Sequence, residues 1–150
     1  MNTAAIANAI AARFAGVTAS NGTVTERIIT GPTARLPAQV GQTPALLVFL
    51  PTGDLGVTAR RRTDVLTFPV RLLRDPLDVP TRVDWLYAWY DALRDVVEGK
   101  MTLGLAYVAW AQPTAVTVEL DGFTYAGTDF DLVELTVAVR LDEVISTLAP

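Results

Sequence analysis

The sequence predicts an α+β domain: an antiparallel or mixed β-sheet with two main helices packed on one face, joined by long loops or arms. Two segments repeat apolar residues with helical spacing, and several others alternate or run apolar over the length of a strand. These segments follow one another as helix, strand pair, helix and then several strands. The 150 residues favour a single domain spanning 1–150, because a chain of this length buries about 70% of the surface that its unfolded form exposes.

The first helix is predicted over residues 3–14, where Ile6, Ile10 and Phe14 form a narrow apolar stripe among many alanines. The segment 17–43 that follows is rich in Thr, Gly and Pro and has no sustained period. Segments of that length without regular structure are uncommon in a small domain. We therefore expect either an extended arm that embraces a neighbouring subunit or a loop that lies on its own domain.

An antiparallel strand pair is predicted over 44–50, a continuous apolar run, and 65–73, where apolar residues alternate. The connection, 51–64, is too long for a tight hairpin turn, so we expect it to project as a loop. This loop carries the most concentrated basic feature of the chain, Arg60, Arg61 and Arg62. These arginines could contact phosphates or pair with carboxylates of a neighbouring subunit, and the alternative is a solvated loop tip.

The second helix, predicted over about 82–98, has the clearest pattern in the sequence. Its apolar residues recur at steps of three and four, and Trp85 and Trp89 widen the stripe. Thr81 stands at the capping position before it. Helical spacing assigns the two tryptophans to the core, because large rings supply much of the buried area in a small domain. The alternative is a ligand-binding domain lined by Trp85, Trp89 and Trp110.

The last third of the sequence predicts several strands. Apolar stretches at 103–111 and 115–120 precede the dipeptide Asp121-Gly122, which is typical of a two-residue hairpin turn. Residues 130–141 then alternate between apolar and polar side chains. One face of this last strand is therefore expected to be buried and the other to be exposed to water.

The chain contains neither His nor Cys, so Ser-His triads, thiolate nucleophiles and Cys/His zinc sites are excluded. Catalysis would have to use other groups, and the candidate set is Glu119, Asp129 and Asp131, which could hold Mg²⁺. Acidic residues at a strand start are also ordinary solvated turn formers. No phosphate-binding glycine motif is present. We therefore expect no catalytic, cofactor-binding or metal-binding residues, with a carboxylate-based Mg-dependent enzyme as the alternative.

Charge is divided unevenly along the chain. Residues 1–75 carry 8 basic and 4 acidic side chains (+4), whereas residues 76–150 carry 4 basic and 12 acidic ones (−8). The pI of about 4.7 argues against a dedicated nucleic-acid-binding domain, which is usually strongly basic. No apolar run approaches the roughly 20 residues that cross a bilayer, so we expect no membrane span. If folding keeps the two halves apart, neighbouring subunits can bind through complementary patches.

The order of these segments resembles that of the small tail-terminator and tail-completion proteins of long-tailed bacteriophages. The resemblance runs from about residue 3 to residue 143. It rests on the Ala-rich first helix, the apolar stretch 43–50, the Arg-bearing loop, the alternating strand, the helix rich in Trp and Leu, and the β-rich last third. It implies a structural virion protein, not an enzyme, that forms a ring, typically a hexamer, which caps the tail tube and provides the surface for head-tail joining.

The partners that this resemblance implies are further copies of the chain, the tail tube protein and a head-tail connector or neck protein. The loop with Arg60, Arg61 and Arg62 matches a loop expected to face the lumen, where it could contact DNA, or an adjoining ring. Localisation in the virion tail or neck, after assembly in the host cytoplasm, is also implied. The alternative within the same class is a neck or head-tail connector subunit.

Overall fold

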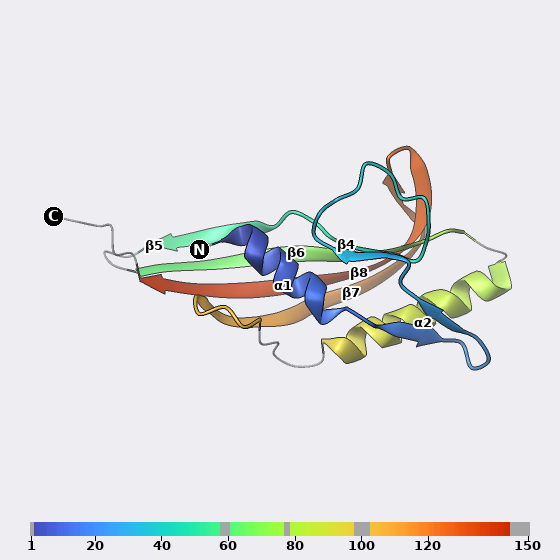
Figure 1. The fold of residues 1–150 in the computed structure, drawn as a ribbon, viewed down its shortest axis with the longest axis horizontal. Helices are drawn as coiled ribbons and strands as arrows, with labels where there is room; N and C mark the ends of the chain where they lie inside the picture. The colour runs from blue at the N-terminus through green and yellow to red at the C-terminus, as the bar shows by residue number, and fades with distance from the viewer. Residues whose placement is uncertain (1, 58–60, 77–78, 98–102, 145–150) are drawn as a thin grey trace.

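The computed structural model describes residues 2–57, 61–76, 79–97 and 103–144. These residues form a six-stranded sheet, a separate two-stranded hairpin and two helices (Figure 1). The elements, in chain order, are α1 (Thr3–Arg13), β1 (Thr18–Ser20), β2 (Thr25–Arg27), β3 (Thr30–Thr33), β4 (Ala45–Val48), β5 (Thr52–Val57), β6 (Arg61–Arg74), α2 (Val79–Val96), β7 (Val108–Tyr125) and β8 (Thr128–Val144). The predicted α+β class is confirmed.

The main sheet has the order β3-β4-β6-β8-β7, and β5 pairs with β6 alongside β4. Strand β3 runs parallel to β4 and the other pairs are antiparallel, so the sheet is mixed. The longest central pair is β6 with β8, which runs from Arg61 opposite Val144 to Arg74 opposite Asp131. This pair joins the strands of the first half of the chain to those of the second half.

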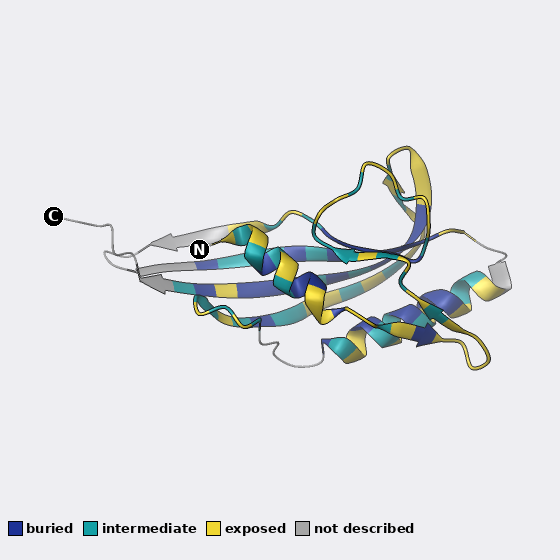
Figure 2. Ribbon diagram, viewed as in Figure 1, coloured by how far each residue is buried: buried dark blue, intermediate teal, exposed yellow. Residues whose placement is uncertain are grey.

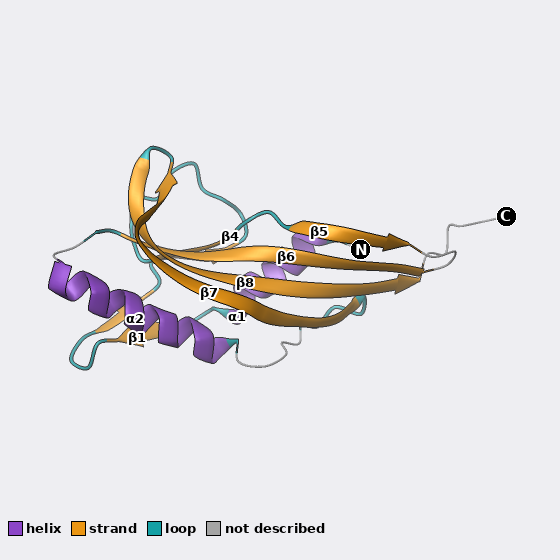
Figure 3. Cartoon of the chain, turned by 180° about the vertical axis from the view of Figure 1, so that it is seen from behind, coloured by secondary structure: helices purple, strands orange, loops and turns teal. Residues whose placement is uncertain are grey.

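The buried side chains of both helices belong to one core cluster with the strands, so both helices pack on the same face of the sheet, as the sequence predicts. Figure 3 shows α1 behind the long strands and α2 below the end at which they curl. Alternate residues of the strands face them, because successive side chains of a strand point to opposite faces. The side chains without exposed surface on this face include Ile6, Ile10, Phe14, Phe68, Val70, Trp89, Leu93, Leu135 and Val137. Each large apolar side chain buried in this way stabilises the fold by about 1.5–3 kcal/mol.

The predicted alternation of β8 is confirmed. The apolar set Val133, Leu135, Val137, Val139 and Leu141 is buried against the helices, and bands of different burial alternate along the strand (Figure 2). On the other face Arg140 is exposed, and Glu134 is partly buried in an ion pair with Arg71. A smaller apolar cluster occupies one end of that face and consists of Ala45, Leu47, Leu73, Phe130 and Leu132.

The two helices are close to their predicted bounds. At the start of α1, Asn2 caps the helix, and its Oδ1 accepts from the Ala5 amide at 3.0 Å. Helix α2 begins at Val79, before the predicted cap Thr81, since Pro80 is tolerated in a first helical turn. The last residue predicted for this helix, 98, lies outside the described residues.

The prediction of a projecting loop over 51–64 is wrong. Residues Thr52–Val57 form β5, and β6 already begins at Arg61. Residues 58–60 between them lie outside the described ranges. Strand β6 extends well beyond the four residues that pair with β4, so its remaining length provides a partner for β5. Residues Thr52–Val57 contain two glycines and do not alternate between apolar and polar side chains. They form a strand because they pair with β6.

Segment 17–43 lies on its own domain. Strands β1 and β2 form a hairpin beside α2, with Ala19 only 3% exposed, and β3 joins the sheet next to β4 (Figure 1). The loop after β3 reaches the β7–β8 hairpin, where the Tyr125 hydroxyl donates to the Pro37 carbonyl. Of the two alternatives for this segment, the structure therefore shows the chain lying on its own domain, where it forms the three short strands β1, β2 and β3.

The hairpin turn predicted at Asp121-Gly122 is also wrong. Strand β7 begins at Val108, later than the predicted 103, and continues to Tyr125. The turn to β8 is Ala126-Gly127, where both residues have positive φ (51° and 82°), as a type I′ turn requires. Asp121 and Gly122 instead belong to a bulge in β7, where Leu120, Asp121 and Gly122 together stand opposite Asp131.

Replacing Ala126 with glycine is expected to stabilise the protein by about 1 kcal/mol, because the left-handed conformation strains a residue with a Cβ atom. Urea denaturation followed by circular dichroism measures the change. The matched control is Ala109→Gly at an exposed position of β7, where loss of the Cβ should destabilise the strand. Equal destabilisation by both substitutions would contradict the explanation.

Candidate interaction site

The predicted interaction residues Arg60, Arg61 and Arg62 are not a loop tip in the described part of the chain. Arg61 and Arg62 belong to β6, where both pair with β8, and Arg62 also pairs with Val57 of β5. Arg60 lies outside the described residues. Arg61 and Arg62 are therefore the first residues of the long strand β6, next to the outer strand β5.

The carboxylates proposed as metal ligands have other partners. Asp131 is fully buried, and its two oxygens accept from Arg82 at 2.6 and 2.7 Å. One of these oxygens also accepts from the Asp121 amide at 2.9 Å. Asp129 is exposed and accepts from the Thr124 hydroxyl. Across the described ranges, no group of three or more acidic side chains is placed to hold a metal ion.

The third carboxylate of that set, Glu119, lies at the edge of the β7 bulge. Its side chain packs so closely against Gly122 that a Cβ there would approach within 2.3 Å of the Glu119 Cβ. The bulge thus needs glycine at this position, and it directs the Asp121 amide toward Asp131. The Asp-Gly dipeptide therefore forms no hairpin turn and instead supplies a backbone hydrogen bond to the buried ion pair of Asp131 and Arg82.

Arg82 and Asp131 connect α2 to β8 through this ion pair. Burial by itself raises the pKa of Asp131, but the hydrogen bonds from Arg82 and Asp121 and the charge of Arg82 outweigh it. The pKa of Asp131 therefore lies below the ordinary value of 3.8. Hydrogen bonds to Asp131 first, and to Asp121 second, raise the pKa of Arg82. Both groups stay charged at neutral pH, and the pair has a structural role.

A second ion pair fastens the β1–β2 hairpin. Glu26 of β2 accepts two hydrogen bonds from Arg74 at 2.9 and 3.0 Å, and a third from the Trp89 indole at 2.7 Å. The Arg74 guanidinium also lies over the Trp85 ring, 5.1 Å from its centre. These contacts tie β2 to β6 and to α2, so the hairpin is held against the domain by both charge and hydrogen bonding.

The tryptophans do not line a common groove. Trp85 and Trp89 are 6% and 0% exposed in the core, as their helical spacing predicts. Trp110 pairs with Arg140 of β8, whereas the next residue, Ala111, belongs to the core under the helices. Because strand side chains alternate, Trp110 faces the other side of the sheet.

In the part of the chain that the structure describes, three strands of the sheet have an open edge: the short strand β3, which pairs with β4 alone, and the longer strands β5 and β7. Strand β5 pairs with β6 alone, and β7 pairs with β8 alone. The register of β7 against β8 shifts at three places, and the longest stretch without a shift is Ala115–Glu119. An open edge carries unpaired N–H and C=O groups and can pair with a strand of another chain.

The uneven charge of the sequence becomes a spatial asymmetry. Helix α1 and strands β3, β4, β5 and β6 come from the first half of the chain, and α2, β7 and β8 come from the second half (Figure 1). The border between the halves follows the β6–β8 pair, and the β1–β2 hairpin beside α2 is the exception. One edge of the sheet therefore belongs to the basic half and the other to the acidic half.

Exposed apolar side chains occur near both edges, and sequence reasoning missed them. On the basic side Leu50 is 80% exposed and Leu36 is 37% exposed. On the acidic side Tyr87 of α2 is 64% exposed and Leu120 of β7 is 49% exposed. Helical spacing contained a signal for Tyr87, because this residue lies between Asp84 and Asp91 on the polar side of the helix.

In the described residues, neither helix has the length and apolarity to span a bilayer. Comparison with protein-family models and with curated proteins found no match, so the geometry of the chain itself carries the functional proposal.

Proposed function

We propose that this chain is a structural assembly subunit whose copies join edge to edge in a closed ring, as in the phage tail-terminator proteins that its sequence resembles. The observation that carries the proposal is a sheet that is open on both sides in its described part, at β3 and β5 on the basic half of the chain and at β7 on the acidic half. A monomer that works alone usually covers or blunts such edges.

The two edges match in length. Strand β5 offers six residues, Thr52–Val57, and the regular stretch of β7 offers five, Ala115–Glu119. The irregular register on either side of that stretch, with Pro113 before it, limits the length over which another strand can pair. Such limits favour one specific partner strand over open-ended aggregation.

A contact between β5 of one copy and β7 of the next is heterologous, because the two surfaces differ. Heterologous contacts generate closed rings when the rotation from copy to copy divides a full turn. The opposite charges of the two halves attract in this arrangement and repel when like edges meet. A ring is therefore the assembly that this subunit favours.

In the proposed ring each copy contributes one sheet, and the ring caps a tail tube and offers its other side to a neck or connector protein. A terminator and a neck subunit share this architecture, and the resemblance favours the terminator. Arg61 and Arg62 stand at the start of β6, where Arg62 pairs with Val57 of β5. In the ring we expect the run Arg60, Arg61 and Arg62 to contact a neighbouring copy or DNA in the lumen. The proposed location is the virion tail or neck.

Native mass spectrometry and negative-stain electron microscopy over a concentration series test the proposal. The expected result is one closed oligomer, typically a hexamer, visible as a ring. Its population should fall as ionic strength rises, because salt screens attraction between exposed charges. A monomer at every concentration and at low salt would overturn the proposal, and so would a symmetric dimer that does not grow further.

A further inference from the structure

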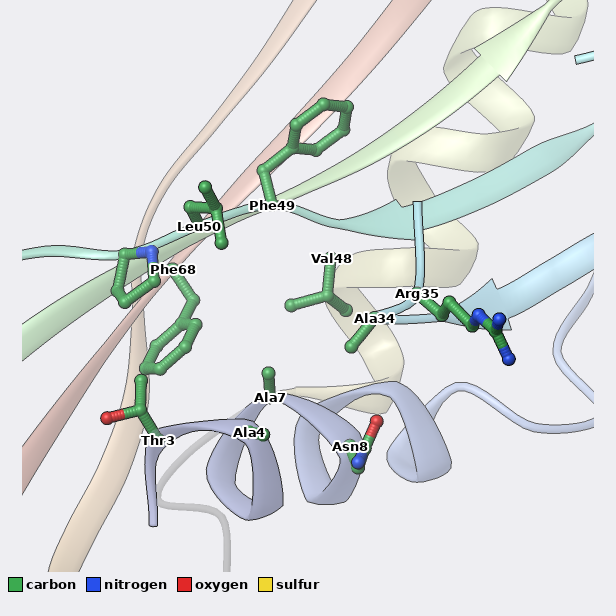
Figure 4. A pocket seen from close by; sticks show the side chains of 11 residues that line it. Thr3, Ala4, Ala7, Asn8, Ala34, Arg35, Val48, Phe49, Leu50 and Phe68 are labelled. Atoms are coloured by element: carbon green, nitrogen blue, oxygen red, sulfur yellow. The ribbon is translucent and has the colours of Figure 1, made fainter. Parts of the chain in front are cut away.

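An apolar groove lies between α1 and the segment that leaves β4, on the basic side of the sheet. Ala4 and Ala7 of α1 form one wall, Val48 and Phe68 form the floor, and the volume is about 400 Å³ (Figure 4). The small side chains of the helix leave this space open. Arg35 lies at the rim and is exposed to water.

The opposite side of the same molecule carries a projecting aromatic side chain. Tyr87 of α2 is 64% exposed, and the apolar space beside it is shared with Leu86, Val118 and Leu120. Asp84 and Asp91, three residues before Tyr87 and four after it, are exposed on the same side of the helix. The ring of Tyr87 is thus flanked by two carboxylates.

We propose that Tyr87 of one copy inserts into the α1–β4 groove of the next copy, where Arg35 pairs with Asp84 or Asp91. This inference rests on the proposed ring and names the side chains that fix how one subunit docks on the next. The groove and Tyr87 both lie on the helix-bearing side of the sheet, toward opposite edges. When β7 of a second copy pairs with β5 of the first, α2 of the second copy therefore lies on the same side of the joined sheets as the groove of the first.

Charge and shape favour a second copy as the occupant. The groove is apolar and has a basic rim, and the projecting ring is aromatic with an acidic surround, so each complements the other. Aromatic residues that fill a pocket within a polar rim commonly dominate the binding energy of protein interfaces. Small-ligand sites instead direct a few convergent polar groups into an enclosed cavity. The groove walls here are mainly alanine, valine and phenylalanine side chains.

Photo-crosslinking locates the contact directly. Benzoyl-phenylalanine in place of Tyr87 keeps an aromatic ring and captures the atoms next to it on irradiation. Peptide mapping of the dimer band is expected to place the crosslink on residues 3–8 or 48–51 of a second copy, the segments that line the groove. Crosslinks on any other surface of an assembled ring would overturn this inference and leave the ring itself standing.

Substitutions supply a second measurement. Tyr87→Ala is expected to raise the protein concentration needed for half-assembly at least about tenfold, as for an interface residue that contributes strongly to binding. Val24→Ala is the matched control, because Val24 is also an exposed apolar side chain (56%) and lines neither the groove nor the apolar space beside Tyr87. Equal effects of the two substitutions would overturn the inference.

Charge reversal tests the pairing of the rim. Arg35→Glu should weaken assembly, and adding Asp84→Arg and Asp91→Arg to the same chain should restore it. Circular dichroism verifies that each variant is folded. A combined variant that folds and assembles more tightly than Tyr87→Ala, yet no better than Arg35→Glu, would contradict the pairing of Arg35 with Asp84 or Asp91. Absence of any oligomer in the unmodified chain would instead overturn the proposed function.

Discussion

Replacing Trp89 with alanine is expected to destabilise the folded protein by about 3–5 kcal/mol, the range observed when a large aromatic side chain is removed from a core. Trp89 has no exposed surface and is the largest of the fully buried side chains. Its indole also donates to Glu26 at 2.7 Å, so the substitution removes a hydrogen bond to a charged group as well. A loss of this size approaches half of the stability of a typical domain.

Urea denaturation followed by far-ultraviolet circular dichroism measures this loss without relying on tryptophan emission. Trp89→Phe is the informative control, because it keeps most of the apolar ring and loses the hydrogen bond. Its destabilisation should be smaller, about 1.5–3 kcal/mol. Trp110→Ala, at a partly exposed position on the other face of the sheet, should have the smallest effect. A loss below about 1 kcal/mol for Trp89→Ala would contradict the packing described above.

Asp131→Asn is expected to destabilise the protein by about 3 kcal/mol, because it leaves Arg82 without its main buried partner. Asp131 has no exposed surface and accepts two hydrogen bonds from Arg82 and one from the Asp121 amide. An asparagine side chain can still accept one of these bonds but brings no negative charge. Asp129→Asn, two residues earlier and exposed, is the matched control and should change stability by less than about 0.5 kcal/mol.

The pH dependence provides an independent measurement of the same interaction. The pKa of Asp131 in the folded protein lies below its ordinary value of 3.8, so its stabilising contribution is fully present above that value. This contribution is lost as the pH falls through the lower pKa of the folded state. The stability difference between the unmodified chain and Asp131→Asn should therefore be constant near neutral pH and shrink in acid. A difference that grows on acidification would contradict the ion pair.

The parts of the fold that the sequence predicts are those whose burial repeats with a fixed period. Helix α2 and strand β8 lie within a few residues of their predicted positions, because Trp85, Trp89 and Val133–Leu141 pack against one shared core. The segment 51–64 has no such period, and its strand structure arises from pairing with β6. Pairing between distant segments leaves no local pattern in the sequence.

The position of the hairpin turn differs from its prediction for a related reason. Asp121-Gly122 has the composition of a turn, but the buried Asp131 on the facing strand draws the Asp121 amide into a bulge. The actual turn, Ala126-Gly127, has alanine where asparagine or aspartate is usual. The tertiary contacts of Asp131 therefore outweigh the local preference of Asp121-Gly122 for a hairpin turn.

The candidate interaction site could be predicted only in part. The uneven charge is readable from the sequence, but its placement on opposite edges depends on the strand order, which no residue pattern specifies. The groove beside α1 depends on how Ala4 and Ala7 meet Val48 and Phe68, residues more than 40 positions apart. Of the predicted interaction residues, Arg60 lies outside the described ranges, and Arg61 and Arg62 belong to a strand.

The position of β8 in the middle of the sheet has a consequence for synthesis. This strand is the last of the described elements, yet it is the one that joins β6 to β7. Until β8 emerges from the ribosome, β6 and β7 have no common strand partner, and the sheet cannot close across its middle. A chain without β8 thus lacks the strand that holds the two sides of the sheet at a fixed separation. If copies join edge to edge as proposed, incomplete chains therefore cannot add to a growing ring.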